Sequence, residues 1–300
     1  MAARRVESSR WPIDHGTLDV LDKRLSAAIF NLQLGVVLES LLSVPGCFFG
    51  MPAFHVVAPA LLACSVDRTG CRAAQPWAMF AVLSATMSLF CAWGLIQRSS
   101  EALRHARLLY LPPTMLASPP IGVSLARALT TDDAALAACY YFLLAWYASV
   151  LPVLTLKAVA RRRRPVACDG ISRAAEGKAL PNIPAMLRSG DPNAAFPSGD
   201  VAGAVAFAYP LWHCAGAPSL AVACVALSAL GRMYWLAHHL LDVACGAAIS
   251  LLTCVALDVA LGAAAGGTLT QLWHPILAFV VVIAYVKLTG VADAAPVKPR

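Results

Sequence analysis

Long apolar runs recur along this chain between short polar connections, and they constrain its fold more than any other feature. A spanning helix needs about 20 mainly apolar residues, and eight stretches are candidates: 27–50, 76–96, 108–129, 134–157, 198–214, 217–232, 239–261 and 275–290. Of the 300 residues, 59% are hydrophobic and only 13% are charged. One soluble core cannot bury that much apolar surface, so lipid must solvate part of it. The sequence predicts an all-α polytopic transmembrane bundle, with a core of about six helices and one or two more.

Polar stretches divide the chain into three predicted parts. These are a polar N-terminal lead-in (1–26), a single transmembrane domain (27–290) and a C-terminal tail (291–300). The core of that domain, 134–261, contains one long polar loop, 158–197, and such a loop in a compact chain is usually functional. Two Pro-Pro pairs should kink or break the segment 108–129. The run 51–65 is too short to cross, so we expect it at the membrane interface.

Basic residues are distributed unevenly between the two membrane faces that this helix order defines. The face that carries both termini and the 158–197 loop has 20 Lys and Arg, whereas the other has three, Arg68, Arg72 and Arg127. The positive-inside rule makes the basic face cytosolic, in either an endomembrane or the plasma membrane. The net charge of +7 lies in a small charged fraction among apolar runs. That pattern fits lipid headgroups or phosphorylated substrates and argues against nucleic acid.

Isolated cysteines and polar residues in the apolar runs have structural interpretations. The ten cysteines form no C-x-x-C pair and resemble small buried hydrophobes. Only Cys64 and Cys71, in a polar connection, are candidates for a disulfide. We interpret His55 and His274 as interfacial anchors. Four polar residues are expected to make contacts between helices or to contact water on the acyl side: Asn31, Gln33, Glu39 and Asp258.

The first segment that could take part in chemistry lies at the end of the apolar run 134–157. Lys157 and Arg164 are seven residues apart, about two helical turns, so both cations project from one side. Pro165 marks the end of this helix. Alone, such a basic run would serve as a stop-transfer anchor, and we expect Arg161, Arg162 and Arg163 to meet lipid headgroups.

The second segment, Phe196–Asp200, precedes the apolar run 198–214. Pro197 and Ser198 suit the start of a helix, where free N–H groups and the helix dipole attract a phosphate. Gly199 lets the backbone approach an anion closely. The same residues also make an ordinary turn and cap, so this motif alone is weak.

The third segment, Gly231–Asp242, joins two apolar runs and contains Arg232 and His238. His238 and Asp242 are four residues apart, which places them on one helical face. The carboxylate can accept the imidazole N–H, fix its tautomer and leave the other nitrogen free as a nucleophile. The alternative is a His-Asp pair that only stabilises the start of a helix.

Together these segments place three cations, a helix N-terminus and an oriented histidine on one face, which suits phosphoryl transfer without a metal. Here the chain resembles the type 2 phosphatidic acid phosphatase superfamily, whose signature is K-x6-R-P, P-S-G-H and S-R-x5-H-x3-D. The first and third motifs match at every spaced position but one. The resemblance covers 157–250 and the flanking helices.

The resemblance implies a role for each matching residue. His238 would attack phosphorus to give a phosphohistidine, and Asp242 would orient the imidazole, with no metal or cofactor. The residues that would bind the phosphate are Lys157, Arg164, Ser198, Gly199 and Arg232.

Two positions depart from the family pattern. Gly231 replaces the usual serine, which removes one hydrogen bond to phosphate. Asp200 replaces the histidine that protonates the leaving oxygen, and an aspartate beside three cations stays ionised and donates a proton poorly. A diphosphate needs little acid help, so this change favours lipid diphosphates. His239 is a possible substitute acid; His213 lies at the wrong end of its helix.

The sequence and the resemblance together predict an integral membrane lipid phosphate phosphatase. Its substrate would enter sideways from the bilayer, and phosphatidate, lysophosphatidate, sphingoid phosphates and isoprenoid diphosphates are candidates. One alternative keeps the site but passes the phosphoryl group to an acceptor alcohol. Another is a catalytically silent lipid-binding or transport protein that retains the anion pocket without the acid.

Overall fold

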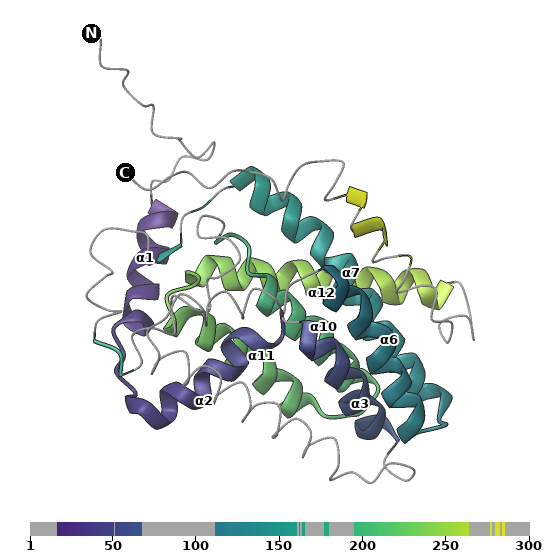
Figure 1. The fold of residues 1–300 in the computed structure, drawn as a ribbon. Helices are drawn as coiled ribbons and strands as arrows, with labels where there is room; N and C mark the ends of the chain where they lie inside the picture. Colours follow the sequence, from purple (N-terminus) through teal and green to yellow (C-terminus); the bar gives the residue numbers. More distant parts are fainter. Residues whose placement is uncertain are drawn as a thin grey trace.

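The computed structural model describes residues 17–50, 52–67, 112–160, 162, 164, 165, 177–179, 195–263, 277, 280–282, 284 and 285. In this part of the chain every named element is a helix, as predicted. They are α1 (Thr17–Phe30), α2 (Gly35–Phe48), α3 (Pro52–Val66), α6 (Pro112–Leu129), α7 (Asp133–Ala160), α10 (Gly199–His213), α11 (Pro218–Tyr234) and α12 (Leu240–Ala263). Figure 1 shows α10 near the centre of the bundle and α1 at one edge.

Helix α10 is the centre of the fold because it contacts α2, α3, α7, α11 and α12. Ser198 caps its N-terminus, since the Ser198 side chain accepts a hydrogen bond from the Val201 N–H. Buried alanines at 202, 204, 206 and 208 let neighbouring helices approach closely. Phe207 packs edge-to-face on Phe54 of α3 and Phe142 of α7, which ties three helices into one aromatic core.

Helix α3 lies in this core, which corrects the expectation of an interfacial helix at 51–65. Phe54, Ala58 and Leu62 are fully buried, and α3 packs against both α6 and α7. His55 is also buried, with its ring 4.1 Å from that of Trp146, so it is a core residue and no interfacial anchor. His274 lies outside the described residues.

Helix α6 runs through the second Pro-Pro pair, which corrects the expectation of a break in 108–129. Pro119 and Pro120 lie within the 18-residue helix, and the first pair lies at its start. α6 crosses α3 at Gly122, where an added Cβ atom would lie 2.1 Å from the His55 carbonyl oxygen. Only a glycine permits so close a crossing.

The predicted span 27–50 is two helices, and the boundary predicted at residue 26 falls inside α1. The chain turns between them at Gly35, whose φ of +74° is a left-handed conformation that suits glycine. α2 has 14 residues and is therefore about 21 Å long. A helix of that length cannot cross a hydrocarbon core of about 30 Å.

Two described helices are long and apolar enough to cross a membrane, Asp133–Ala160 and the Leu240–Leu261 part of α12. They suggest that the protein associates with membranes. α12 leaves Leu251, Leu252 and Val259 exposed, as expected of a surface that lipid covers. The candidate span 76–96 and most of 275–290 lie outside the described residues, so the number of crossings stays a prediction.

The bundle end where α7 begins carries a polar contact and a disulfide. The Thr130 hydroxyl donates to Asp67 at the end of α3, and nearby Cys64 is disulfide-bonded. Cys71 lies outside the described residues. With 28 residues, α7 is about 42 Å long, so its other end, where Lys157 lies, is far from this disulfide.

Two of the four polar residues predicted to join helices do so. Tyr234 of α11 donates to Glu39 of α2, and Tyr209 of α10 donates to Asp258 of α12. Asn31, which follows α1, is exposed and donates to the Ala27 carbonyl of that helix. Gln33 is exposed.

Candidate active site

Four helix ends meet at the end of the bundle away from the disulfide. They are the C-termini of α7 and α11 and the N-termini of α10 and α12. Ser198 joins two of them, because its backbone N–H donates to the Asp242 carbonyl at 2.9 Å. Gly246 of α12 makes this approach possible, since a Cβ atom there would lie 2.3 Å from the Ser198 carbonyl oxygen. The three motifs are therefore brought together, as predicted.

His238 lies in the turn between α11 and α12 and not on a helix as we expected. The Ala237 and His238 N–H groups both donate to the Arg232 carbonyl, which holds the turn against the end of α11. The turn passes through Leu236 at φ +57°, a conformation rare for leucine. Such backbone strain is typical of functional turns.

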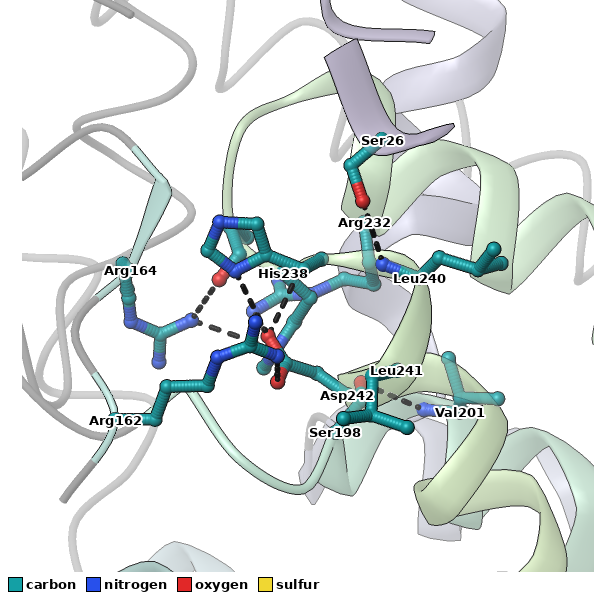
Figure 2. A network of polar contacts seen from close by, with 12 residues as sticks. Ser26, Arg162, Arg164, Ser198, Val201, Arg232, His238, Leu240, Leu241 and Asp242 are labelled. Atoms are coloured by element: carbon teal, nitrogen blue, oxygen red, sulfur yellow. Dashed lines mark hydrogen bonds and ion pairs between the residues drawn. The ribbon is translucent and has the colours of Figure 1, made fainter. Parts of the chain in front are cut away.

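Two arginines converge on one nitrogen of the His238 ring. Nε2 lies 3.4 Å from Arg164 Nη1 and 3.3 Å from Arg232 Nη2. Guanidinium groups only donate, so Nε2 is the acceptor and carries no proton, which leaves the ring proton on Nδ1. Figure 2 shows Arg164 and Arg162 reaching toward His238 and Asp242 from the same side. The free electron pair of Nε2 thus points to where two cations meet.

The environment of His238 keeps its imidazole neutral. The residue is 1% exposed, and burial together with the cations Arg232, Arg164 and Lys157 holds the pKa of His238 well below its usual range, although Asp242 acts in the opposite direction. A neutral imidazole is the nucleophilic form.

Asp242 lies behind the imidazole in the first turn of α12. Its Oδ2 atom is 3.8 Å from His238 Nδ1, too far for a hydrogen bond, and accepts the His239 backbone N–H at 2.8 Å. The same atom is 3.5 Å from the His239 ring. The carboxylate thus faces both histidines, and each histidine is 1% exposed.

Two more of the predicted phosphate-binding residues, Lys157 and Gly199, lie at helix ends that meet here. Lys157, in the last turn of α7, interacts electrostatically with Arg164, Arg232 and Asp200. Gly199 begins α10. A Cβ atom at Gly199 would meet only Val153, at an ordinary 3.7 Å, so packing within the protein does not require glycine there.

Asp200, which stands where the family has histidine, pairs with one of these cations. Its Oδ2 atom is 3.2 Å from Arg232 Nη2. Gly50, two residues after the end of α2, lies against it, because a Cβ atom at Gly50 would be 2.4 Å from Asp200 Oδ1. The ion pair cancels part of the positive charge that the site offers to a substrate.

Gly231, the other departure, has a packing reason that the sequence did not reveal. A Cβ atom on it would lie 2.5 Å from the Gly46 Cα atom, because α2 crosses α11 at this point. The Gly46 carbonyl also accepts a hydrogen bond from Arg232 Nη1 at 3.1 Å. The space that a serine side chain needs is filled by α2.

Arg162, which we expected at lipid headgroups, is instead a buried residue of the site. Arg162 is 6% exposed and bonds Asp242, Asp22 and Asp19. Arg161 and Arg163 lie outside the described residues. The spacing of Asp19, Asp22 and Ser26 on one face of α1 was the available signal, since three polar residues there require a polar partner.

The chain was compared with protein families, curated proteins and solved structures. Residues 134–264 match the model of the PAP2 superfamily. No curated protein and no solved structure matched. The matched range runs from α7 through α12, so it contains the three motifs, whereas α1, α2, α3 and α6 precede it.

Proposed function

Residues 134–264 form a domain of the PAP2 superfamily, which includes lipid phosphate phosphatases, and on this premise we propose that the protein removes phosphate from a lipid phosphate within a membrane. Members are typically phosphatases, so the family implies a phosphate-ester substrate. The observation that carries the proposal is the approach of Arg164 and Arg232 to one unprotonated nitrogen of His238.

The first step transfers the phosphoryl group to the enzyme. His238 Nε2 forms a bond to the terminal phosphorus while the bond from that phosphorus to its bridging oxygen breaks. This gives a phosphohistidine and releases the lipid monophosphate from a diphosphate, or the lipid alkoxide from a monoester. Arg164, Arg232 and Lys157 bind the non-bridging oxygens, where charge must be neutralised. The proton stays on Nδ1, and the negative charge of Asp242 offsets the positive charge that the imidazole gains.

The second step regenerates the enzyme. Water attacks phosphorus, the bond to Nε2 breaks and inorganic phosphate leaves with the oxygen of that water. The same cations neutralise the charge in both steps, because the phosphoryl group stays in place while its partner changes. The free electron pair then returns to Nε2.

The substrate preference follows from the leaving group. From a phosphomonoester the leaving group is the lipid alkoxide, which needs a proton, and Asp200, ion-paired with Arg232, is a poorer proton donor than the histidine of the family pattern. From a lipid diphosphate the leaving group is the lipid monophosphate, which departs readily without protonation. We therefore assign lipid diphosphates as the preferred class, with phosphatidate-like monoesters as poorer substrates.

Lateral access from lipid is supported by the apolar surface of the bundle. α12 exposes leucines and valines along its length, and α1 exposes Leu18, Leu21 and Leu25. The excess of Lys and Arg on the face that carries the site supports a position on the cytosolic side. The substrate headgroup would enter there, while its chains remain in the bilayer.

Phosphate release by the purified full-length protein in detergent tests the proposal. The substrates are dioleoyl phosphatidate and farnesyl diphosphate, and His238→Ala and orthovanadate should each reduce release to background. Undiminished release by His238→Ala would exclude this nucleophile. Product formation from an added alcohol without free phosphate would instead identify a phosphotransferase, and inactivity toward both lipids with retained binding would identify a silent lipid-binding protein.

A further inference from the structure

Helix α1 has its polarity reversed relative to a helix on the surface of a soluble protein. Its polar residues Asp22 and Ser26 are buried, at 6% and 0% exposed, whereas Leu18 and Leu25 are 77% and 50% exposed. A helix normally turns its apolar side inward. The polar side of α1 must therefore have a specific partner inside the protein.

That partner is the start of α12, which carries Asp242. Asp22 Oδ1 accepts the Leu241 N–H at 2.8 Å, and Ser26 Oγ accepts the Leu240 N–H at 2.9 Å. Both are first-turn N–H groups, which have no partner within their own helix. Figure 2 shows Ser26 reaching Leu240 beside His238 and Asp242.

Arg162 completes the link between α1 and the site. Its Nη2 atom is 2.5 Å from Asp22 Oδ2 and 3.1 Å from Asp19 Oδ1, while Nη1 is 2.6 Å from Asp242 Oδ1. Asp242 is fully buried, so its charge needs this counter-ion. With Oδ1 bound to Arg162, the other oxygen accepts the His239 N–H and lies 3.8 Å from Nδ1 of His238.

We propose that Arg162, held by Asp22 and Asp19 of α1, is a positioning residue that fixes the orientation and charge of Asp242 behind the nucleophile His238. The N-terminal helix thereby belongs to the catalytic apparatus although it lies outside the family domain. This inference rests on the proposed function. Arg162 touches no reacting atom; it acts through Asp242.

Kinetics of full-length variants separate positioning from substrate binding. For phosphate release from farnesyl diphosphate, Arg162→Gln should lower kcat by roughly 10- to 100-fold, as loss of an outer orienting group does, and leave KM within about twofold of the wild-type value. Arg162→Lys should recover part of kcat. The matched control is Arg127→Gln. Arg127 is exposed at the other end of the bundle, so this variant should keep the wild-type kcat.

Asp22→Asn tests the link to α1 without changing side-chain shape. It should also lower kcat. The fold reduction in kcat of the double variant with Arg162→Gln should be smaller than the product of the two single reductions, because both residues act through Asp242. An increase in KM with unchanged kcat would overturn the proposal and make Arg162 a substrate-binding residue. If Arg162→Gln does not fold, the effect of Asp22→Asn on kcat and KM tests the proposal alone.

A second readout needs no turnover. The groups facing His238 are Asp242, Arg232, Arg164 and Lys157. Removing the Arg162 charge leaves Asp242 uncompensated, which favours the imidazolium, so the His238 signal in histidine-labelled NMR spectra should titrate at higher pH in Arg162→Gln. An unchanged midpoint would overturn the positioning role even in a protein that releases no phosphate, whereas absence of release from the wild type alone refutes the proposed function.

Discussion

Gly46 of α2 and Gly231 of α11 meet where the two helices cross, so closely that a methyl group on Gly231 would lie 2.5 Å from the Gly46 Cα atom. The crossing fills the position of a side chain that the family pattern places in its active site. It also brings the Gly46 carbonyl to Arg232 Nη1. A serine side chain at position 231 and α2 in its present place are thus sterically incompatible.

Restoring that serine should destabilise the protein. Gly231→Ser forces α2 and α11 apart, and overpacking of this kind costs about 1–3 kcal/mol. Thermal unfolding in detergent should show a lower midpoint than that of the wild type. Gly199→Ala is the matched control, because its added methyl group would make only an ordinary contact. An unchanged midpoint for Gly231→Ser would show that the helices do not cross as described.

Introducing the family histidine at position 200 should change substrate preference. Asp200→His supplies a proton donor and removes the ion pair with Arg232, so phosphatidate turnover should rise by roughly tenfold or more, in line with general acid catalysis. Farnesyl diphosphate turnover should change less. Comparing kcat/KM for both lipids tests this, with Asp133→Asn at the opposite end of α7 as control. Complete loss of both activities would mean that Asp200 has another, required role.

The pH dependence of activity follows from the lowered pKa of His238. The neutral imidazole attacks, and burial with the adjacent cations holds the pKa of His238 well below 6.5. The nucleophile thus stays unprotonated as pH falls through 6.5, and kcat/KM should decline only at lower pH. The pH profile for farnesyl diphosphate, whose leaving group needs no proton, is the suitable measurement. An acid limb centred at 6.5 or above would contradict the buried, cation-flanked position of this ring.

The side of the membrane that carries the site can be measured at Ala179, an exposed residue of the long loop. In sealed, right-side-out vesicles, a cysteine at this position should react with a membrane-impermeant maleimide only after the vesicles are opened. The cysteine is introduced into a variant of the protein that has no other reactive cysteine. Asp133→Cys, at the opposite end of α7, should show the reverse pattern. Labelling of position 179 in intact vesicles would place the site on the outer face.

The sequence was sufficient for the helical class and for the residues that gather around His238, because apolar run length and motif spacing are local properties. It did not show that 27–50 breaks into two helices, since a single glycine in a mainly apolar segment does not by itself mark a helix boundary. It also assigned Arg162 to lipid. Arg162 and Arg164 belong to the same basic run, and only the contacts of the folded chain show that Arg162 lies against Asp242.

His55 is a second residue whose contacts could not be predicted from the sequence. Its interpretation as an interfacial residue is wrong because α3 is buried and packs against both α6 and α7. A short apolar segment is equally consistent with a core helix and with one at the lipid surface. The helices that pack against the segment decide between the two, and these helices are distant from it in the sequence.

The reversed polarity of α1 matters for how this protein is produced and tested. A fragment trimmed to the family match, 134–264, would leave the Arg162 guanidinium with one carboxylate instead of three and would uncap Leu240 and Leu241. Inactivity of such a fragment would reflect the missing contacts of α1 and would not show that the catalytic residues are inactive. Turnover should therefore be assayed on protein expressed from residue 1.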